Sequence, residues 1–247
     1  MSIESPADLA ALRHIGKIVG EILQALREAV GPGVTTAELD ALAGAEMKKR
    51  GAQSSPKLVY EFPGEMCISV NDEVVHGVPG SRRLHEGDIV KLDLTAQKDG
   101  YVADACISVP VGEVSGRAQK LMSCAERAFQ KALTAARAGN PVNEIGRVVE
   151  QEVRSSGFEV VRALTGHGVG RTIHEKPEVA NYYEPRNRAM LTDGLVLTIE
   201  PIITAGRDDV YTASDQWTVK TRDRALSAHF EHTLVITQGE PIILTAA

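Results

Sequence analysis

Apolar side chains in the first thirty residues recur at the spacing of one helix face. They occupy positions 9, 12, 15, 19, 22, 23 and 26, the repeat expected when a helix packs one side against a core. Ser5, Pro6 and Asp8 have the arrangement typical of a helix N-terminus, with a capping serine and a first-turn proline. We therefore predict a helix from Pro6 that ends at the glycine-proline-glycine sequence 31–33.

A second helix and several strands follow. Thr35 and Glu38 have the spacing of a capping box, which predicts a helix to about Arg50, ended by Gly51. Apolar and polar residues then alternate, which indicates strands. We predict two strands at 66–70 and 73–76 around an Asn71-Asp72 turn, and an antiparallel hairpin from 89–96 and 101–109.

The second half of the chain repeats this order of helices and strands. The alanine-rich residues 115–138 predict a helix, and Asn140-Pro141 predicts the start of another that runs to Gly157. We predict further strands at 158–164, 194–204, 216–220 and 230–237. Because helices and strands are grouped and no linker separates them, we predict an α+β fold in one domain over 1–247. The repeated order indicates two related halves, although no clear sequence repeat is visible.

Composition narrows the possible partners. The 247 residues include 27 basic and 33 acidic ones, for a net charge of −6. Nucleic-acid binders usually carry a basic excess, so we expect no nucleic-acid partner. No apolar segment approaches the ~18 residues that cross a bilayer, so we expect no membrane partner. Neither a signal peptide nor paired cysteines are visible, and we expect a cytoplasmic protein with reduced thiols at Cys67, Cys106 and Cys124.

Two aspartates lie on the predicted 89–109 hairpin. Asp93 shares the polar face of its strand with Lys91. A Lys98-Asp99 loop would place Asp93 directly opposite Asp104, whereas an Asp99-Gly100 loop would make them diagonal neighbours on one face. Like charges this close are destabilising. The pair therefore indicates either a solvated polar face or a cation held between the two carboxylates.

Two histidines and two glutamates lie farther along the chain. His167 and His174 flank a glycine-rich segment, GHGVGRTIHE, that fits neither the zinc helix HExxH nor a P-loop. They are either loop histidines or ligands. Glu200 lies in the apolar segment LVLTIEP, where an unpaired carboxylate is costly, and Pro201 indicates that this strand bends or ends there. Glu231 lies in HFEHTLVIT. Each glutamate alone is better explained as a solvated or ion-paired residue.

Together these residues favour a metal centre. Four buried carboxylates would repel one another, and each would lose several kcal/mol of hydration after relaxation. Two divalent cations would cancel those charges. Oxygen ligands with one histidine suit Mn, Fe(II), Co or Zn. A pair of such ions is a device for hydrolysis.

The motifs that carry these residues resemble a known family. They are SVNDEVVHGVPG, LHEGDIVKLDLTAQKDGYVADAC, GHGVGRTIHEKPEV, LVLTIEP and WTVKTRDRALSAHFEHTLVI. In this order they are similar to the type I methionine aminopeptidases. That resemblance implies the pita-bread fold, with two pseudo-symmetric halves and a curved antiparallel sheet covered by helices. It also implies removal of an N-terminal methionine before a small second residue by a dimetal-activated hydroxide.

The resemblance implies a ligand set for two divalent metal ions. Asp93 corresponds to the chelating ligand of the first metal. Asp104 and Glu231 correspond to the bridging carboxylates, and His167 and Glu200 to the ligands that complete the second site. Glu200 is also the family's usual candidate to accept a proton from the bridging water.

The resemblance also implies roles for residues around the metals. His76 and His174 correspond to the two histidines that contact the peptide and stabilise the tetrahedral intermediate. Four further residues fall near positions that line the methionine pocket: Phe62, Cys67, Ile173 and Trp217. Residues 56–63 depart from the family pattern, and Ile173 replaces a common aromatic residue.

Two expectations from the resemblance concern partners. Asn71, Glu73 and Ser227 correspond to positions that hold a monovalent cation, partly through main-chain carbonyls. The substrates would be the N-termini of peptides or nascent proteins, and we expect a monomer. The alternatives are a broader or prolidase-like aminopeptidase, which only the side-chain pocket would distinguish, and a non-enzymatic binding module with the same fold.

Overall fold

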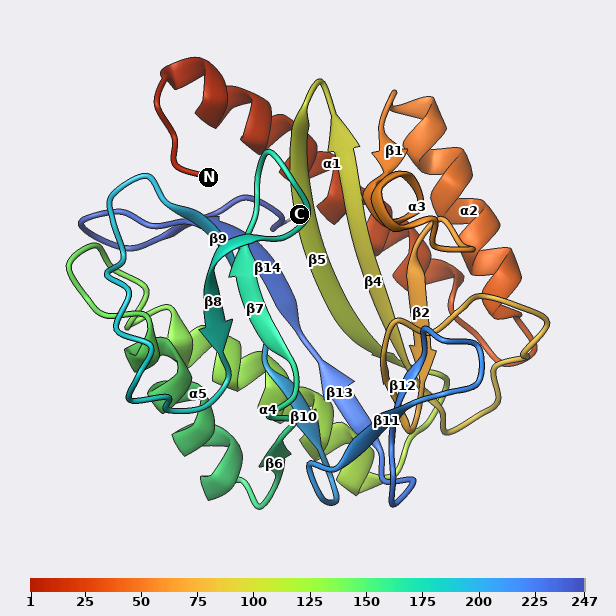
Figure 1. Ribbon diagram of the computed structural model, residues 1–247. Coiled ribbons are helices and arrows are strands. Elements are labelled where there is room, and N and C mark those ends of the chain that lie inside the picture. Colours follow the sequence, from red (N-terminus) through yellow and green to blue (C-terminus); the bar gives the residue numbers. More distant parts are fainter. Residues whose placement is uncertain (247) are drawn as a thin grey trace.

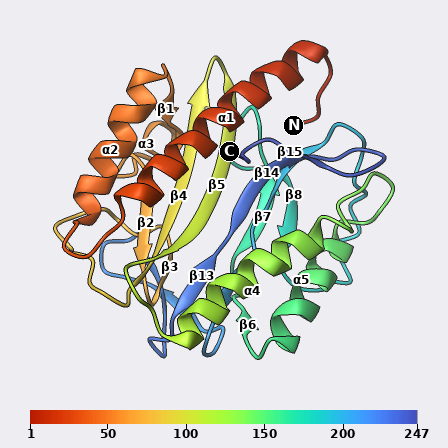
Figure 2. The same cartoon turned by 180° about the vertical axis from the view of Figure 1, so that it is seen from behind.

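The computed structural model describes residues 1–246. A curved antiparallel sheet forms the centre, and the four long helices cover its back (Figures 1 and 2). The helices are α1 (Pro6–Ala29), α2 (Thr36–Lys49), α3 (Ser55–Tyr60), α4 (Gly116–Ala132) and α5 (Asn143–Ser155). This architecture confirms the predicted α+β pita-bread fold.

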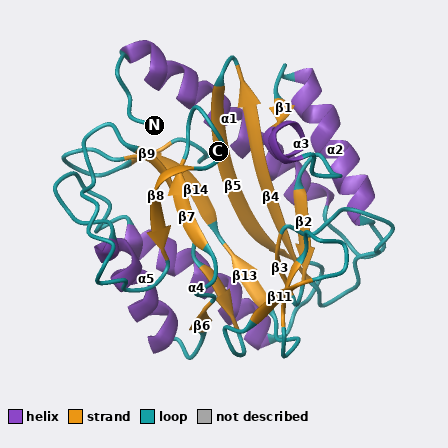
Figure 3. Cartoon of the chain, in the orientation of Figure 1, coloured by secondary structure: helices purple, strands orange, loops and turns teal. Residues whose placement is uncertain are grey.

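Most of the strands belong to one sheet. Its order is β1-β4-β5-β14-β9-β7-β8, and β2 pairs with β4 and β15 with β14. Two further three-stranded sheets have the orders β13-β10-β6 and β11-β12-β3. They lie below the main sheet (Figure 3). The strands are β1 (Gln53–Ser54), β2 (Cys67–Val70), β3 (Glu73–Val75), β4 (Ile89–Lys98), β5 (Tyr101–Pro110), β6 (Glu159–Val160), β7 (Thr165–Gly168), β8 (Glu175–Ala180), β9 (Val196–Ile199), β10 (Ile202–Thr204), β11 (Val210–Thr212), β12 (Val219–Thr221), β13 (Ser227–His229), β14 (Glu231–Val235) and β15 (Ile242–Ile243).

Each half of the molecule packs two helices against its part of the sheet. Apolar residues of α1 and α2, such as Ile22 and Leu39, form one core with β2, β4 and β5. Residues of α4 and α5, such as Phe129 and Val149, form a second core with β9, β10 and β14. No helix within residues 1–246 is long and apolar enough to span a bilayer.

The central hairpin has the Asp99-Gly100 loop. Both loop residues have positive φ values, 52° and 78°, as expected for a two-residue hairpin turn that follows the sheet twist. Lys98 therefore pairs with Tyr101. In this register Asp93 lies opposite Cys106 rather than opposite Asp104, so the two aspartates are diagonal neighbours on one face.

Both predicted N-terminal caps are confirmed. The Ser5 hydroxyl accepts a hydrogen bond from the Asp8 amide at the start of α1. Thr35 and Glu38 form the capping box of α2. These caps are local in sequence, which explains why the pattern alone identifies them.

Two predictions about the second half were wrong. The α4 helix ends at Ala132 rather than at 138. The α5 helix begins at Asn143 without a side-chain cap, because the Asn140 amide donates to the Ala135 carbonyl instead and Pro141 forms a bridge with Met190. For the glycine-rich histidine segment, where loop histidines were one of two alternatives, the first part is strand β7, paired with β8.

Candidate metal centre and substrate pocket

One cavity of about 610 Å³ lies on the open face of the sheet. Every residue predicted to hold a divalent metal, contact the peptide or receive the methionine side chain lines it. They are Phe62, Cys67, His76, Asp93, Asp104, His167, Ile173, His174, Glu200, Trp217 and Glu231. The fold therefore brings into one pocket residues that are up to 169 positions apart in the sequence.

Adjacent strands place the five predicted ligands. Asp93 and Asp104 come from β4 and β5, and Glu231 begins β14, where it pairs with Cys106 of β5. His167 lies on β7, and Glu200 directly follows β9. β5, β14, β9 and β7 are consecutive in the sheet (Figure 1), and the five side chains line one pocket.

Ligand atoms of Asp104, His167, Glu200 and Glu231 lie within a few ångströms of one another. The His167 Nε2 atom lies 3.6 Å from Glu200 Oε1 and 3.9 Å from Asp104 Oδ2. Asp104, His167 and Glu231 can each place one ligand atom within 4.8 Å of the others. These distances leave room for a cation between the side chains rather than direct contact between them.

Hydrogen bonds within the protein do not satisfy this cluster. Asp104 Oδ1 and Glu231 Oε1 are buried and have no hydrogen-bond partner in the structure. Buried polar atoms are nearly always partnered because an unpaired one costs free energy. Carboxylate and imidazole atoms that face one another without a donor between them are suited to divalent cations, so the residues fit the metals that the sequence predicts.

The electrostatics support the same conclusion. Burial raises the pKa values of Asp93, Glu200 and Glu231 well above the usual range, and the charge of Asp104 raises all three further. Burial also lowers the pKa of His167, which keeps its imidazole neutral. A neutral imidazole is the form that ligates metals, and bound cations would restore the ionised form of the carboxyl groups.

Two neighbouring side chains hold Glu200 in place. Thr198 donates its hydroxyl to Glu200 Oε1 at 2.8 Å and accepts the His167 amide at 3.1 Å. The Asn181 amide donates to the Glu200 carbonyl at 2.9 Å. These bonds hold Glu200 between the end of β9 at Ile199 and the start of β10 at Ile202, consistent with the predicted break of the strand near Pro201.

The two predicted peptide-contacting histidines stand at the edge of the cluster. The His174 ring packs against His167 with 4.3 Å between ring centroids, and its Nδ1 atom lies 2.7 Å from the Tyr60 hydroxyl. His76 has a positive φ of 56°. A Cβ on the following Gly77 would lie 2.3 Å from the Ile68 carbonyl oxygen, so this turn requires glycine.

An apolar wall lies beside the predicted metal ligands. Phe62 and Trp217 meet edge to face with 5.3 Å between ring centroids. Cys67, Ile173 and Tyr60 complete the lining. Tyr60 ends the short helix α3, which the sequence analysis did not predict, although its capping Ser54 and Pro56 are the signal of a helix start.

His229 is a pocket residue that the sequence analysis missed. Its side chain is 2% exposed, and its Nε2 atom lies 3.4 Å from Glu231 Oε2 and 3.7 Å from Glu200 Oε2. That nitrogen has no hydrogen-bond partner in the structure. Burial lowers the pKa of His229 to about 3. The available signal was its position two residues before Glu231, since such residues share one face of a strand.

The three residues predicted to bind a monovalent cation also meet. The Ser227 hydroxyl lies 2.9 Å from the Asn71 carbonyl and 3.2 Å from the Glu73 carbonyl. The ammonium group of Lys91 lies among the same oxygens.

Comparison with known proteins identifies the family. The model of metallopeptidase family M24 matches residues 10–238. The chain is 44% identical to methionine aminopeptidase 2 of Bacillus subtilis, over 99% of both chains, and 43% identical to a methionine aminopeptidase of Clostridium perfringens, over 98% of both. The solved methionine aminopeptidase of Thermotoga maritima is 34% identical, with a TM-score of 0.97 over the whole of both chains. A Pyrococcus furiosus prolidase shares the fold at 22% identity, with a TM-score of 0.80 over 99% of this chain and 65% of the prolidase. This chain therefore belongs to metallopeptidase family M24.

Proposed function

We propose that this chain is a methionine aminopeptidase that hydrolyses the first peptide bond of a polypeptide after an N-terminal methionine. The observation that carries the proposal is one pocket in which four carboxylates and His167 converge beside an apolar wall. The similarity to methionine aminopeptidases over nearly the whole chain supports the same activity.

The five converging side chains would hold two divalent cations. Asp93 would chelate the first, Asp104 and Glu231 would bridge, and His167 and Glu200 would complete the second site. When bound, the cations acidify a water molecule and polarise the scissile carbonyl. The mixture of oxygen and nitrogen donors suits Mn, Fe(II), Co or Zn.

Glu200 would move the proton of the attacking water. The Thr198 hydroxyl occupies Glu200 Oε1, which leaves Oε2 facing the pocket. In its ionised form this carboxylate would accept the proton of the water as a general base and then return it to the departing amine.

His174 would stabilise the oxyanion. If the Tyr60 hydroxyl donates to His174 Nδ1 across 2.7 Å, the single proton of the neutral ring lies on Nε2. Burial keeps the ring neutral by lowering its pKa. The Nε2–H group would then be a fixed donor to the carbonyl oxygen, and His76 would contact the peptide from the turn that follows β3.

The apolar wall would receive the methionine side chain. Phe62, Trp217 and Cys67 offer aromatic edges and sulfur, which interact favourably with a thioether. The free α-amine of the substrate would bind at the acidic cluster. A substrate with an acetylated N-terminus would therefore not fit.

Cleavage of matched peptides tests the proposal. Metal-loaded protein is expected to release methionine from Met-Ala-Ser and to leave N-acetyl-Met-Ala-Ser intact. Equal cleavage of the two peptides would contradict an aminopeptidase. Comparing Met-Ala-Ser with Leu-Ala-Ser and Ala-Pro-Ser then separates methionine specificity from a broader or prolidase-like activity, and absence of cleavage despite metal uptake would favour a binding module.

A further inference from the structure

Lys91 is the largest side chain buried almost completely, at 1% exposure. Its Nζ atom donates to the Asn71 carbonyl at 2.8 Å, the Ser227 hydroxyl at 3.0 Å and the Ser227 carbonyl at 3.3 Å. All three partners are oxygens, and they match the three N–H groups of an ammonium ion. A buried lysine that satisfies every donor in this way indicates a specific role.

A free monovalent cation does not fit among these oxygens. The ion that the sequence resemblance implies would use the carbonyls of Asn71 and Ser227, where the Lys91 ammonium already makes its contacts. A second cation would lie against the ammonium at ion-contact distance, and like charges repel strongly in a buried site.

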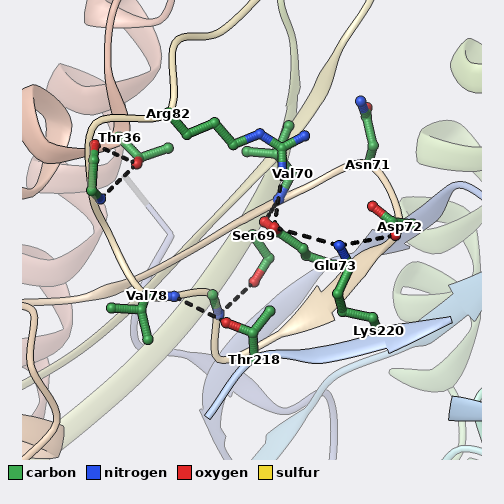
Figure 4. A network of polar contacts seen from close by, with 12 residues as sticks. Thr36, Ser69, Val70, Asn71, Asp72, Glu73, Val78, Arg82, Thr218 and Lys220 are labelled. Carbon is green, nitrogen blue, oxygen red and sulfur yellow. Dashed lines mark hydrogen bonds and ion pairs between the residues drawn. The ribbon is translucent and has the colours of Figure 1, made fainter. Parts of the chain in front are cut away.

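The charges around Lys91 favour one positive group. The nearby carboxylates of Glu73 and Asp72 carry negative charge that favours a positive group at Lys91. Glu73 also accepts the Val70 amide at 2.8 Å and pairs with Arg82 and Lys220 on the outer side of the turn (Figure 4). The turn is thus braced by basic residues outside and by Lys91 within.

We propose that the Lys91 ammonium is a built-in replacement for a monovalent cation, so that this chain holds the turn at Asn71 without a bound alkali-metal ion. The group acts as a positioning residue, because it does not line the pocket.

Three segments that supply pocket residues meet at this ammonium. Asn71, with a positive φ of 56°, forms the turn that leads through β3 to His76. Ser227 begins β13, which leads to His229 and Glu231. Lys91 itself lies two residues before Asp93 on β4 and shares its face. Loss of the ammonium would therefore loosen the pocket from below.

Thermal unfolding in different salts tests the proposal. We measure the midpoint for metal-loaded protein in potassium, sodium or choline chloride at one ionic strength. The wild-type midpoint is expected to be the same in all three salts. Lys91→Ala opens the oxygen cradle, so its midpoint should fall by roughly 5–15 °C in choline chloride and recover by several degrees in potassium or sodium, with saturation.

Two control variants isolate the cradle. Lys91→Met removes the charge but fills the space, so alkali-metal ions should not rescue it. Lys220→Ala removes a lysine that pairs with Asp72 and Glu73 from outside the cradle, and it should show no preference among the salts. A wild type that responds to potassium, or a folded Lys91→Ala that ignores it, would overturn the proposal.

Anomalous scattering gives a test that needs no variant. Wild-type crystals soaked in rubidium chloride are expected to show no rubidium peak beside the Asn71 and Ser227 carbonyls, whereas a peak there would overturn the proposal. None of these measurements depends on peptide cleavage, so they stand or fall separately from the proposed function.

Discussion

Asp104 shows how a single residue couples charge to stability. Its side chain is 5% exposed, and burial raises its pKa to about 6, with a hydrogen bond from Thr95 opposing the shift. Without metal, the folded protein therefore binds a proton at Asp104 more tightly than the unfolded chain does. This contribution to stability is present below the unfolded pKa, near 3.8, and is lost as the pH rises through about 6.

We expect this loss to appear in the metal-free protein. With chelator present, the unfolding free energy of wild type relative to Asp104→Asn should fall by on the order of 2 kcal/mol between pH 4 and pH 7. Urea unfolding at several pH values measures it. Using the difference between the two proteins cancels the opposing effect of carboxylates whose pKa values are lowered, such as Asp8. A difference that stays constant with pH would contradict the argument.

His174 and Tyr60 form a pair whose roles can be separated. If His174 stabilises the oxyanion, His174→Ala should lower kcat by about 10²–10³ with little change in KM. Tyr60→Phe removes only the hydrogen bond that fixes the tautomer, so we expect a loss of about 5- to 10-fold in kcat. Steady-state kinetics on Met-Ala-Ser measures both. An unchanged kcat for His174→Ala would assign the oxyanion to other donors.

His229 is expected to strengthen metal binding. Its Nε2 atom faces Glu200 and Glu231 without a hydrogen-bond partner, so it either ligates a cation or orients these carboxylates. His229→Leu should weaken the affinity for Mn or Co by roughly 10- to 100-fold, measured by isothermal titration calorimetry. His229→Gln keeps a polar group and should lose less. Equal affinities for wild type and His229→Leu would make His229 a packing residue.

At the scale of elements, two glycines separate helix packing from helix propensity. A Cβ at Gly146 of α5 would lie 2.2 Å from the Tyr182 carbonyl oxygen and 2.5 Å from that of Ala180. At Gly116, which begins α4, a Cβ would meet nothing within 4 Å. The α5 helix therefore approaches the β8 backbone as closely as glycine allows.

Alanine substitutions at these positions should have opposite effects. Gly146→Ala is expected to destabilise the protein by about 1–3 kcal/mol because neither backbone can move freely. Gly116→Ala should be neutral or stabilise it by up to about 1 kcal/mol, since alanine favours the helix. Urea unfolding of the two variants checks this, and equal effects would mean that α5 can shift away from β8.

The elements that the sequence predicted are those with local signals. The α1 and α2 caps and the β4–β5 hairpin depend on residues a few positions apart. The β7–β8 hairpin was missed because the glycines around His167 are typical of loops, whereas tertiary pairing with Leu197 of β9 makes the segment a strand. The sequence around Asn140 is typical of a helix cap, but the Asn140 side chain instead donates a hydrogen bond to the Ala135 carbonyl. The role proposed for Lys91 could be inferred only from the folded structure, because its partners Asn71 and Ser227 are 156 positions apart in the sequence.

At the scale of the whole molecule, the pocket lies between the two halves. Asp93 and Asp104 come from the half that contains α1 and α2, whereas His167, Glu200 and Glu231 come from the half that contains α4 and α5. Divalent cations at this place would link the halves. The single domain, the monomer and the cytoplasmic location stay predictions from the sequence.

Metal removal should therefore weaken both halves together. A ligand that binds only the folded state adds about 4 kcal/mol at a thousand times its dissociation constant, which for a chain of this size corresponds to a midpoint shift of roughly 8–16 °C. We expect chelation to lower the thermal midpoint by this amount and to reduce hydrogen-exchange protection in the β4–β5 hairpin and in β7, β9 and β14 alike. Glu231→Gln removes one bridging charge. It should reduce the fall of the thermal midpoint on chelation, because the variant binds metal more weakly and has less repulsion among the carboxylates when metal is absent. If chelation exposed only β7 and β9 while β4 and β5 stayed protected, the cations would belong to one half, and the bridging roles of Asp104 and Glu231 would have to be abandoned.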